Sequence, residues 1–227
     1  MKKIFFILSP FLFFGSLFGQ DASRSPVAIV TKVVQVVDFK IEEENWKKAN
    51  IGQTLTTGNE VKTGQRSLAI VKFIDNSILR IRENSSVILF ANRVENAMLK
   101  NTEIKNGRLN FKISEQENDE FRFTTPTMVA SIRGTSGFFD VDAEGNTVLF
   151  VNEGSVEVRG TQGNQQTNTV GAGNYTEVTN VGNVEVKEGG EEQQSQFNQS
   201  NKTRTRQIII KSPQGDIVIE YLDDELD

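Results

Sequence analysis

The stretch Ile51–Ile81 decides the fold class; it reads IGQTLTTGNEVKTGQRSLAIVKFIDNSILRI. Within it, Leu68, Ile70, Lys72 and Ile74 alternate with Ala69, Val71 and Phe73. Successive side chains of a strand point to opposite faces, so both faces of this strand are largely apolar. That pattern is typical of a central strand covered on both sides. Asp75-Asn76-Ser77 predicts a turn into the next strand, residues 78–82.

The same period of two continues through most of the chain from Val27 onward. Phe121, Phe123 and Thr125 alternate, and a turn at residues 144–146 separates two further apolar runs. Gly and Asn residues that favour turns recur at short intervals. This spacing predicts an all-β roll, sandwich or solenoid-like domain over residues 27–180, without crossover helices. Apart from one turn near Glu42–Lys48, no segment has a convincing helical period.

The composition excludes several classes of function. The chain has 227 residues, 37% of them hydrophobic, with no Cys and no His. It therefore has material for a core, but no disulfide, thiolate zinc site or iron–sulfur cluster. The commonest general base and the commonest transition-metal ligand are also missing. We expect a binding or scaffolding module, with no enzymatic activity, cofactor or metal.

Several chemical motifs are incomplete or absent in the sequence. Asp140, Asp142 and Glu144 resemble part of a calcium loop, but Val151 takes the place of the acid at the loop's end. Residues 171–173 lack the third glycine and the helix of a dinucleotide site. The many Ser and Thr residues have no His to activate them. A pair of carboxylates that cleaves glycosides remains an open alternative, because such residues can be far apart in the sequence and come together only in the folded protein.

The N-terminus, MKKIFFILSPFLFFGSLFGQ, is typical of a secretory signal peptide over residues 1–20. Lys2 and Lys3 precede an apolar run that is shorter than the roughly 20 residues of a spanning helix. An uncleaved membrane anchor is the alternative. No later stretch is apolar enough to span a bilayer, so we expect an exported protein, periplasmic or at the cell surface, with no stable membrane span after cleavage.

The charge argues against two kinds of partner. The net charge is −5, from 25 basic and 30 acidic residues, and loss of Lys2 and Lys3 makes it −7. A nucleic-acid-binding protein is expected to carry a basic stripe. A binder of anionic lipid is expected to be basic too. We therefore expect a protein or an envelope polymer as the partner.

The C-terminal part differs from the body. Residues 187–206, KEGGEEQQSQFNQSNKTRTR, are polar and predict a linker. Residues 207–222 then predict a hairpin with its turn at residues 213–216. An isolated hairpin is marginal in water. It could pair with an edge of its own domain, add as a strand to a partner, or remain disordered.

Short motifs follow one another in a recognisable order: the opening stretch, then NGRLNFKI, FRFTTPTMVASIRGTSGFFDV, NEGSVEV and VGAGNYTEV. This order, over about residues 28–180, resembles the FecR domain of bacterial envelope proteins. Its motif positions, structural or candidate binding residues, are Gly52, Gly58, Thr63, Gly64, Asp75, Ser77, Gly107, Thr125, Pro126, Arg133, Gly134, Thr135, Gly154 and Gly173.

The resemblance implies an all-β fold, described as a short twisted solenoid-like roll, and a role in signalling. The best-known members regulate sigma factors and also carry an anti-sigma segment, a membrane helix and a signalling domain. This sequence shows none of those segments, so the anti-sigma role is not carried over. We expect a non-catalytic exported module that binds a protein or envelope component; the alternative is a structural, surface-polymer-binding module.

The motif residues also suggest individual roles. The glycines suit tight turns, and Asp75 and Ser77 can hydrogen-bond the backbone of their turn. Pro126 suits a strand start or edge, because it has no amide hydrogen. Arg133 is interpreted as a semi-buried guanidinium paired with a carboxylate, with ligand contact as the alternative.

Overall fold

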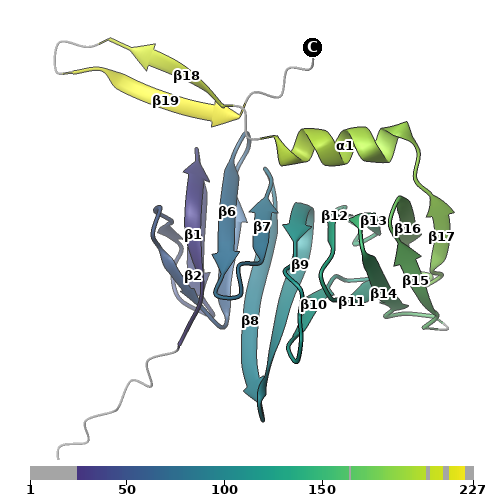
Figure 1. The fold of residues 1–227 in the computed structure, drawn as a ribbon. Helices are drawn as coiled ribbons and strands as arrows, with labels where there is room; N and C mark the ends of the chain where they lie inside the picture. Colours follow the sequence, from purple (N-terminus) through teal and green to yellow (C-terminus); the bar gives the residue numbers. More distant parts are fainter. Residues whose placement is uncertain (1–24, 164, 203–204, 212–214, 223–227) are drawn as a thin grey trace, which may run out of the picture.

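The alternating apolar residues pair into two stacked β-sheets. The structure is a computed structural model, which describes residues 25–163, 165–202, 205–211 and 215–222. Seventeen strands form one continuous hydrogen-bonded sheet. Figure 1 shows this sheet folded into a two-layered body, with a helix and a separate hairpin at its margin. The predicted all-β fold is confirmed.

We name the two layers sheet A and sheet B. Sheet A contains, in spatial order, β4 (Thr54–Thr56), β1 (Pro26–Val34), β6 (Leu68–Phe73), β7 (Ile78–Ile81), β9 (Ala97–Lys112), β12 (Ser136–Val141), β13 (Thr147–Glu153), β16 (Asn174–Val178) and β17 (Glu185–Glu188). Sheet B contains β3 (Lys47–Lys48), β2 (Val37–Ile41), β5 (Asn59–Thr63), β8 (Ser86–Val94), β9, β10 (Glu120–Thr124), β11 (Met128–Ile132), β14 (Ser155–Gly160) and β15 (Thr167–Gly171). All these pairings are antiparallel except β9 with β10.

Strand β9 belongs to both sheets. Its first part pairs with β8 up to Asn106, opposite Ser86, and its last part pairs with β7 and β12 from Gly107 to Lys112. Gly107 lies at the bend between the two parts, with φ of +94°. The single strand therefore ties the two layers together in the middle of the body.

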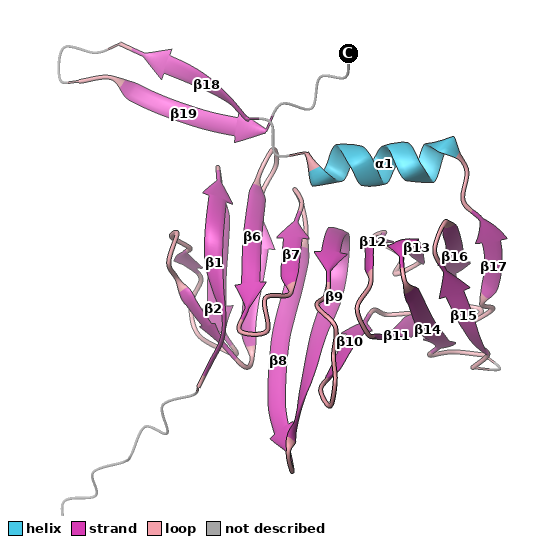
Figure 2. Ribbon diagram, in the orientation of Figure 1, coloured by secondary structure: helices cyan, strands magenta, loops and turns pink. Residues whose placement is uncertain are grey.

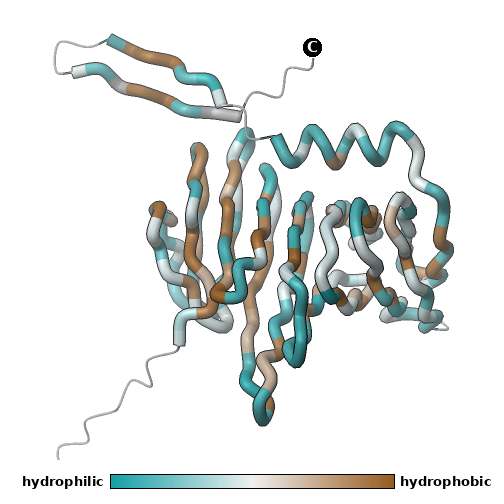
Figure 3. The backbone as a smooth tube through the Cα atoms, in the orientation of Figure 1, coloured by the Kyte–Doolittle hydropathy of each residue, from teal (hydrophilic) through white to brown (hydrophobic). Residues whose placement is uncertain are grey.

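The core lies between the layers. Phe73 of sheet A meets Phe121 of sheet B with ring centroids 5.1 Å apart, and Phe139 of sheet A meets Phe123 at 4.9 Å. All four rings are almost fully buried. Figure 3 shows apolar and polar segments alternating along the strands of the body. Burial of aromatic rings at this spacing is a large apolar contribution to stability.

Where a polar linker was predicted over residues 187–206, the structure has a strand and a helix, so that prediction is wrong for most of the segment. Strand β17 ends at Glu188, and helix α1 spans Glu191–Asn201; it is the one helix among the described residues (Figure 2). The side-chain oxygen of Gln193 accepts a hydrogen bond from the Gly190 N–H, which closes the N-terminus of the helix.

Tertiary contacts explain why α1 forms despite its polar sequence. Its one apolar residue, Phe197, packs on Phe138 and Phe150, which point outward from sheet A. Ser200 accepts a hydrogen bond of 2.7 Å from the side chain of Asn110 on β9. A helix of 11 residues is marginal alone in water, so these contacts stabilise it.

The hairpin forms a separate two-stranded sheet. Strand β18 (Thr205–Ile210) pairs antiparallel with β19 (Ile217–Leu222), close to the predicted 207–222. The predicted signal peptide, residues 1–20, lies outside the described residues. None of the helical structure in the described residues has the length and apolarity to cross a membrane.

Replacing Gly107 by Ala is expected to destabilise the protein by about 3 kcal/mol or more. An added Cβ would lie 2.5 Å from the Ser85 Cα atom, and the positive φ adds about 1–2 kcal/mol of strain. Gly52→Ala is the matched control, because Gly52 has φ of +86° but no atom within 4 Å of an added Cβ. Urea unfolding measures both; equal losses would contradict the packing role of Gly107.

Candidate functional site

The motif glycines mark the places where the chain crosses between the sheets. These crossings are at Gly52, Gly58, Gly64, Gly107, Gly134, Gly154 and Gly173. Gly154, for example, joins β13 of sheet A to β14 of sheet B, and an added Cβ would lie 2.8 Å from the Gly134 carbonyl oxygen. The glycines lie along both edges of the sandwich and do not converge on one pocket.

Motif hydroxyl groups fasten these crossings. The Thr63 hydroxyl donates to the Arg82 carbonyl and accepts from the Ser85 N–H at 3.0 Å. The Thr135 hydroxyl donates to the Ser155 carbonyl at 3.0 Å. The Thr125 hydroxyl accepts from the Thr147 hydroxyl at 2.8 Å. Each bond joins segments that are far apart in the sequence. The hydroxyl groups of Thr63, Thr125, Thr135 and Thr147 therefore stabilise the fold.

Pro126 and Arg133 lie in connecting loops. Pro126 is exposed between β10 and β11, and its carbonyl accepts a hydrogen bond from Thr161. Arg133 is exposed between β11 and β12, and no ion pair joins it to another described residue. The interpretation of Arg133 as a semi-buried, carboxylate-paired guanidinium is therefore wrong. Contact with a ligand stays a prediction.

Asp75 makes the predicted turn bond, accepting from the Ser77 N–H at 2.9 Å, but it also belongs to a buried charge cluster. The Lys100 ammonium lies 2.6 Å from an Asp75 carboxylate oxygen and 3.0 Å from one of Asp119. Only 1% of the Lys100 side chain is exposed. Gln116 donates a further hydrogen bond to Asp75. The sequence contains no signal for this cluster, because its members come from three separate segments.

The pKa values of both carboxyl groups in the cluster are lowered. Burial acts to raise the pKa of Asp75, but hydrogen bonds from Lys100, the Ser77 amide and Gln116 outweigh it. The Met98 N–H and then Lys100 lower the pKa of Asp119. Hydrogen bonds to a carboxylate favour its charged form. The cluster is thus a fixed ion triad, in which the lowered pKa values keep the carboxyl groups of Asp75 and Asp119 ionised at neutral pH.

Replacing Lys100 by Met is expected to cost about 3–5 kcal/mol at pH 7, because it leaves a partly buried carboxylate unpaired. Depressed carboxyl pKa values stabilise the fold above the unfolded value of about 4, and this contribution is lost as pH falls through the folded values. The gap in unfolding free energy between the variant and the wild type should therefore narrow below about pH 4.

Lys47→Met is the matched control. Lys47 pairs with Glu44 at 2.9 Å, and 61% and 52% of the two side chains are exposed. An exposed pair contributes about 1 kcal/mol or less. Chemical unfolding at pH 7 and pH 3 compares the variants; a constant gap for Lys100→Met would contradict the ion triad.

Among the described residues, no group of three or more Asp and Glu side chains could hold a metal ion. Asp142 instead closes the β12–β13 hairpin, accepting hydrogen bonds of 2.8 Å from the backbone and side chain of Asn146. The Asn146 bonds lower the pKa of Asp142. Asp142 thus serves as a turn residue, whereas Asp140 lies on β12 and pairs with Arg108.

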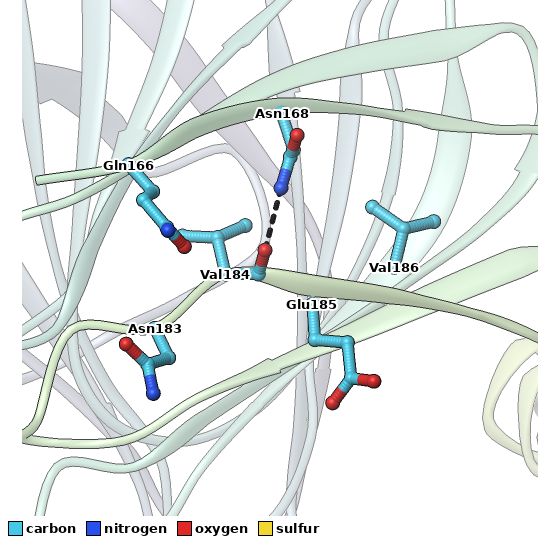
Figure 4. A pocket seen from close by; sticks show the side chains of 6 residues that line it. All are labelled: Gln166, Asn168, Asn183, Val184, Glu185 and Val186. Atoms are coloured by element: carbon cyan, nitrogen blue, oxygen red, sulfur yellow. Dashed lines mark hydrogen bonds between the residues drawn. The ribbon is translucent and has the colours of Figure 1, made fainter.

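A groove lies where both sheets end, between β15 and β17. It has a volume of about 540 Å³ and is lined by Gln166, Asn168, Asn183, Val184, Glu185 and Val186. Figure 4 shows the Asn168 amide donating to the Val184 carbonyl, with the side chains of Gln166, Asn183 and Glu185 around it. The sequence does not predict this site, because its residues carry no motif.

The groove combines two features of a binding site. In the described pairings, β15 joins β14 on one side and β17 joins β16 on one side, so each strand has a free edge. A free edge presents unpaired backbone groups to which an extended segment can add. The amide side chains of Gln166, Asn168 and Asn183 add further donors and acceptors. This arrangement suits binding, and it holds no nucleophile paired with a base.

Comparison with solved structures finds the same fold. Two crystal structures of a candidate anti-sigma factor from Parabacteroides distasonis, at 1.65 Å and 2.50 Å resolution, each match with a TM-score of 0.52 and 15% identity. Each match covers 62% of this chain and 64% of the solved chain, less than two thirds of its length. At this identity the likeness shows the fold alone. No curated protein matches the chain in sequence.

A family model agrees with the order of motifs. The model described as FecR protein matches residues 59–157, which run from β5 into β14 and include the bend at Gly107. The match is shorter than the resemblance over residues 28–180, but it contains most of the crossings. Over residues 59–157 this chain is therefore similar to proteins of the FecR family.

Proposed function

We propose that the protein is a non-catalytic, exported module that binds another protein in signalling or regulation. The groove between β15 and β17 carries this proposal, because it places two free strand edges beside polar side chains. The match of residues 59–157 to the FecR family model supports a regulatory role. Export rests on the sequence of residues 1–20.

The mode of binding follows from the strand edges. An extended partner segment would add to β15 or β17 through backbone hydrogen bonds, which supply affinity with little dependence on sequence. Side chains of the groove, such as Gln166 and Asn183, would then select the partner.

A structural, polymer-binding role is the second candidate. The lining of Gln166, Asn168 and Asn183 favours it, since amide groups can both donate to and accept from the hydroxyl groups of a polysaccharide. In that case the occupant would be wall or surface glycan.

The test compares the wild-type protein with a variant whose groove is blocked. Gln166→Arg with Asn183→Arg fills the groove with two long charged side chains; Asn92→Arg with Asn96→Arg, at the exposed tip of β8–β9, is the matched control. Each protein is immobilised and exposed to envelope extract from its source cells. We expect the wild type and the control to retain one stoichiometric protein, and the groove variant to lose at least about tenfold in affinity.

Hydrogen exchange locates the contact. Bound protein should protect the amides of β15 and β17 in the wild type. Retention of wall polymer in place of a protein would favour the second candidate. Binding that is equal in all three proteins, without protection of β15 and β17, would contradict the groove as the site.

A further inference from the structure

The two ends of the sandwich differ in how well their strand edges resist pairing with another chain. At one end, β3 consists of Lys47 and Lys48 alone, and β4 has three residues. Short, lysine-rich edge strands resist such pairing. At the opposite end lie β15, with the sequence TNTVG, and β17, with the sequence EVKE (Figure 1). Strand β15 contains no charge and no Pro, so this end is the one open to strand addition.

The hydrogen-bond pattern shows which backbone groups of β15 point to its free edge. The Gly160 N–H donates to the Gln166 carbonyl at 3.0 Å, so these two residues form a hydrogen-bonded pair with β14. In an antiparallel ladder such pairs alternate with pairs that are not hydrogen-bonded. The backbone groups of Thr167 and Thr169 therefore point away from β14. Within the described part of the chain, no segment outside the ladder hydrogen-bonds to them.

The same alternation applies to β17. The Gly189 N–H donates to the Gly173 carbonyl at 2.8 Å, which sets the phase of the β16–β17 ladder. Val186, opposite Thr176, falls between hydrogen-bonded pairs, so its backbone groups point to the free edge. Thr176 is buried, and the Val186 side chain lies on the same inner face of the sheet, yet it is 36% exposed. Strand β17 thus ends sheet A with an uncovered apolar residue.

Strand β15 is complementary to itself. If a two-fold axis passes through Asn168, Thr167 of each copy lies opposite Thr169 of the other copy. In this register the backbone groups that point outward from the two strands meet each other. Cross-strand Thr pairs are favourable, and the absence of charge avoids repulsion between the two edges.

Strand β17 is complementary to itself in charge. If the axis passes through Val186, Glu185 of each copy lies opposite Lys187 of the other, and the two Val186 residues meet through their outward backbone groups. Within one copy, Lys187 lies 3.7 Å from Glu185, and 44% and 76% of their side chains are exposed, so both can take a second partner. The next symmetric register would place Glu185 opposite Glu188, which is unfavourable.

We propose that two copies of this chain associate end to end, β15 with β15 and β17 with β17, so that both sheets continue from one copy into the other. Asn168 and Val186 both line the groove, so one two-fold axis can serve both pairings (Figure 4). A two-fold axis closes the assembly at a dimer. This inference rests on the strand addition proposed above. It names a second copy as the occupant of the groove when the envelope partner is absent.

The first experiment tests the charge pairing by sedimentation equilibrium of the full chain from about 1 to 200 µM. Glu185→Lys and Lys187→Glu each place like charges opposite one another at two positions of the dimer. We expect dissociation constants at least about tenfold weaker for each variant. The variant with both changes is the matched control: it restores opposite charges, so it should dimerise like the wild type. A mixture of the two single variants should also associate, for the same reason.

The second experiment tests the backbone pairing. Thr169→Pro removes an N–H that the fold of one copy does not use, and we expect it to abolish the dimer. Thr169→Val is the matched control, because it keeps the N–H and nearly the same shape, and it should leave the dimer intact. Thermal unfolding checks that each variant folds; if Thr169→Pro does not, the charge variants still decide.

A wild type that stays monomeric over the whole range would overturn the proposal. Capture of an envelope protein by the groove would then stand or fall on its own test, so the two failures are distinguishable. A wild-type dimer that the single charge variants and a folded Thr169→Pro variant leave unchanged would place the contact elsewhere and would overturn the proposal equally.

Discussion

The passage of β9 from one sheet to the other is the constraint on which the rest of the structure depends. Residues before Gly107 pair in sheet B, and residues after it pair in sheet A. Ile104 and Phe111, on the two parts of the strand, both lie in the common core. The layers cannot separate without breaking β9. Gly107 can make the bend because it has no side chain, and Ser85 occupies the space that a Cβ atom would need. The other crossings repeat this arrangement toward both ends.

Much of the fold is visible in the sequence because strand periodicity is local. Leu68–Phe73 alternates as the sequence predicts, and its inward residues are buried. The glycines are correctly expected at turns, but the sequence does not separate crossings from hairpins, since strand pairing is non-local. Helix α1 escapes prediction for a physical reason: its one apolar side chain, Phe197, is stabilised by Phe138 and Phe150, whose outward direction only the fold defines.

The candidate sites are less predictable than the fold. Asp75 is expected in a turn, yet its main partner, Lys100, comes from a strand that no local pattern connects to it. The groove joins residues 166–168 to residues 183–186, outside the family match. The motif residues stabilise the segments that cross between the two sheets. The family match therefore covers residues that hold the fold together. The groove that we propose for binding lies at one end of the body, outside the family match.

Native-state hydrogen exchange tests the coupling of the two sheets most directly. Because β9 is common to both layers, the amides of β7 and β12 in sheet A should open with the same free energy as those of β8 and β10 in sheet B, equal to the global free energy of unfolding. Two distinct opening energies, with one sheet exchanging while the other stays protected, would contradict a single body built around β9.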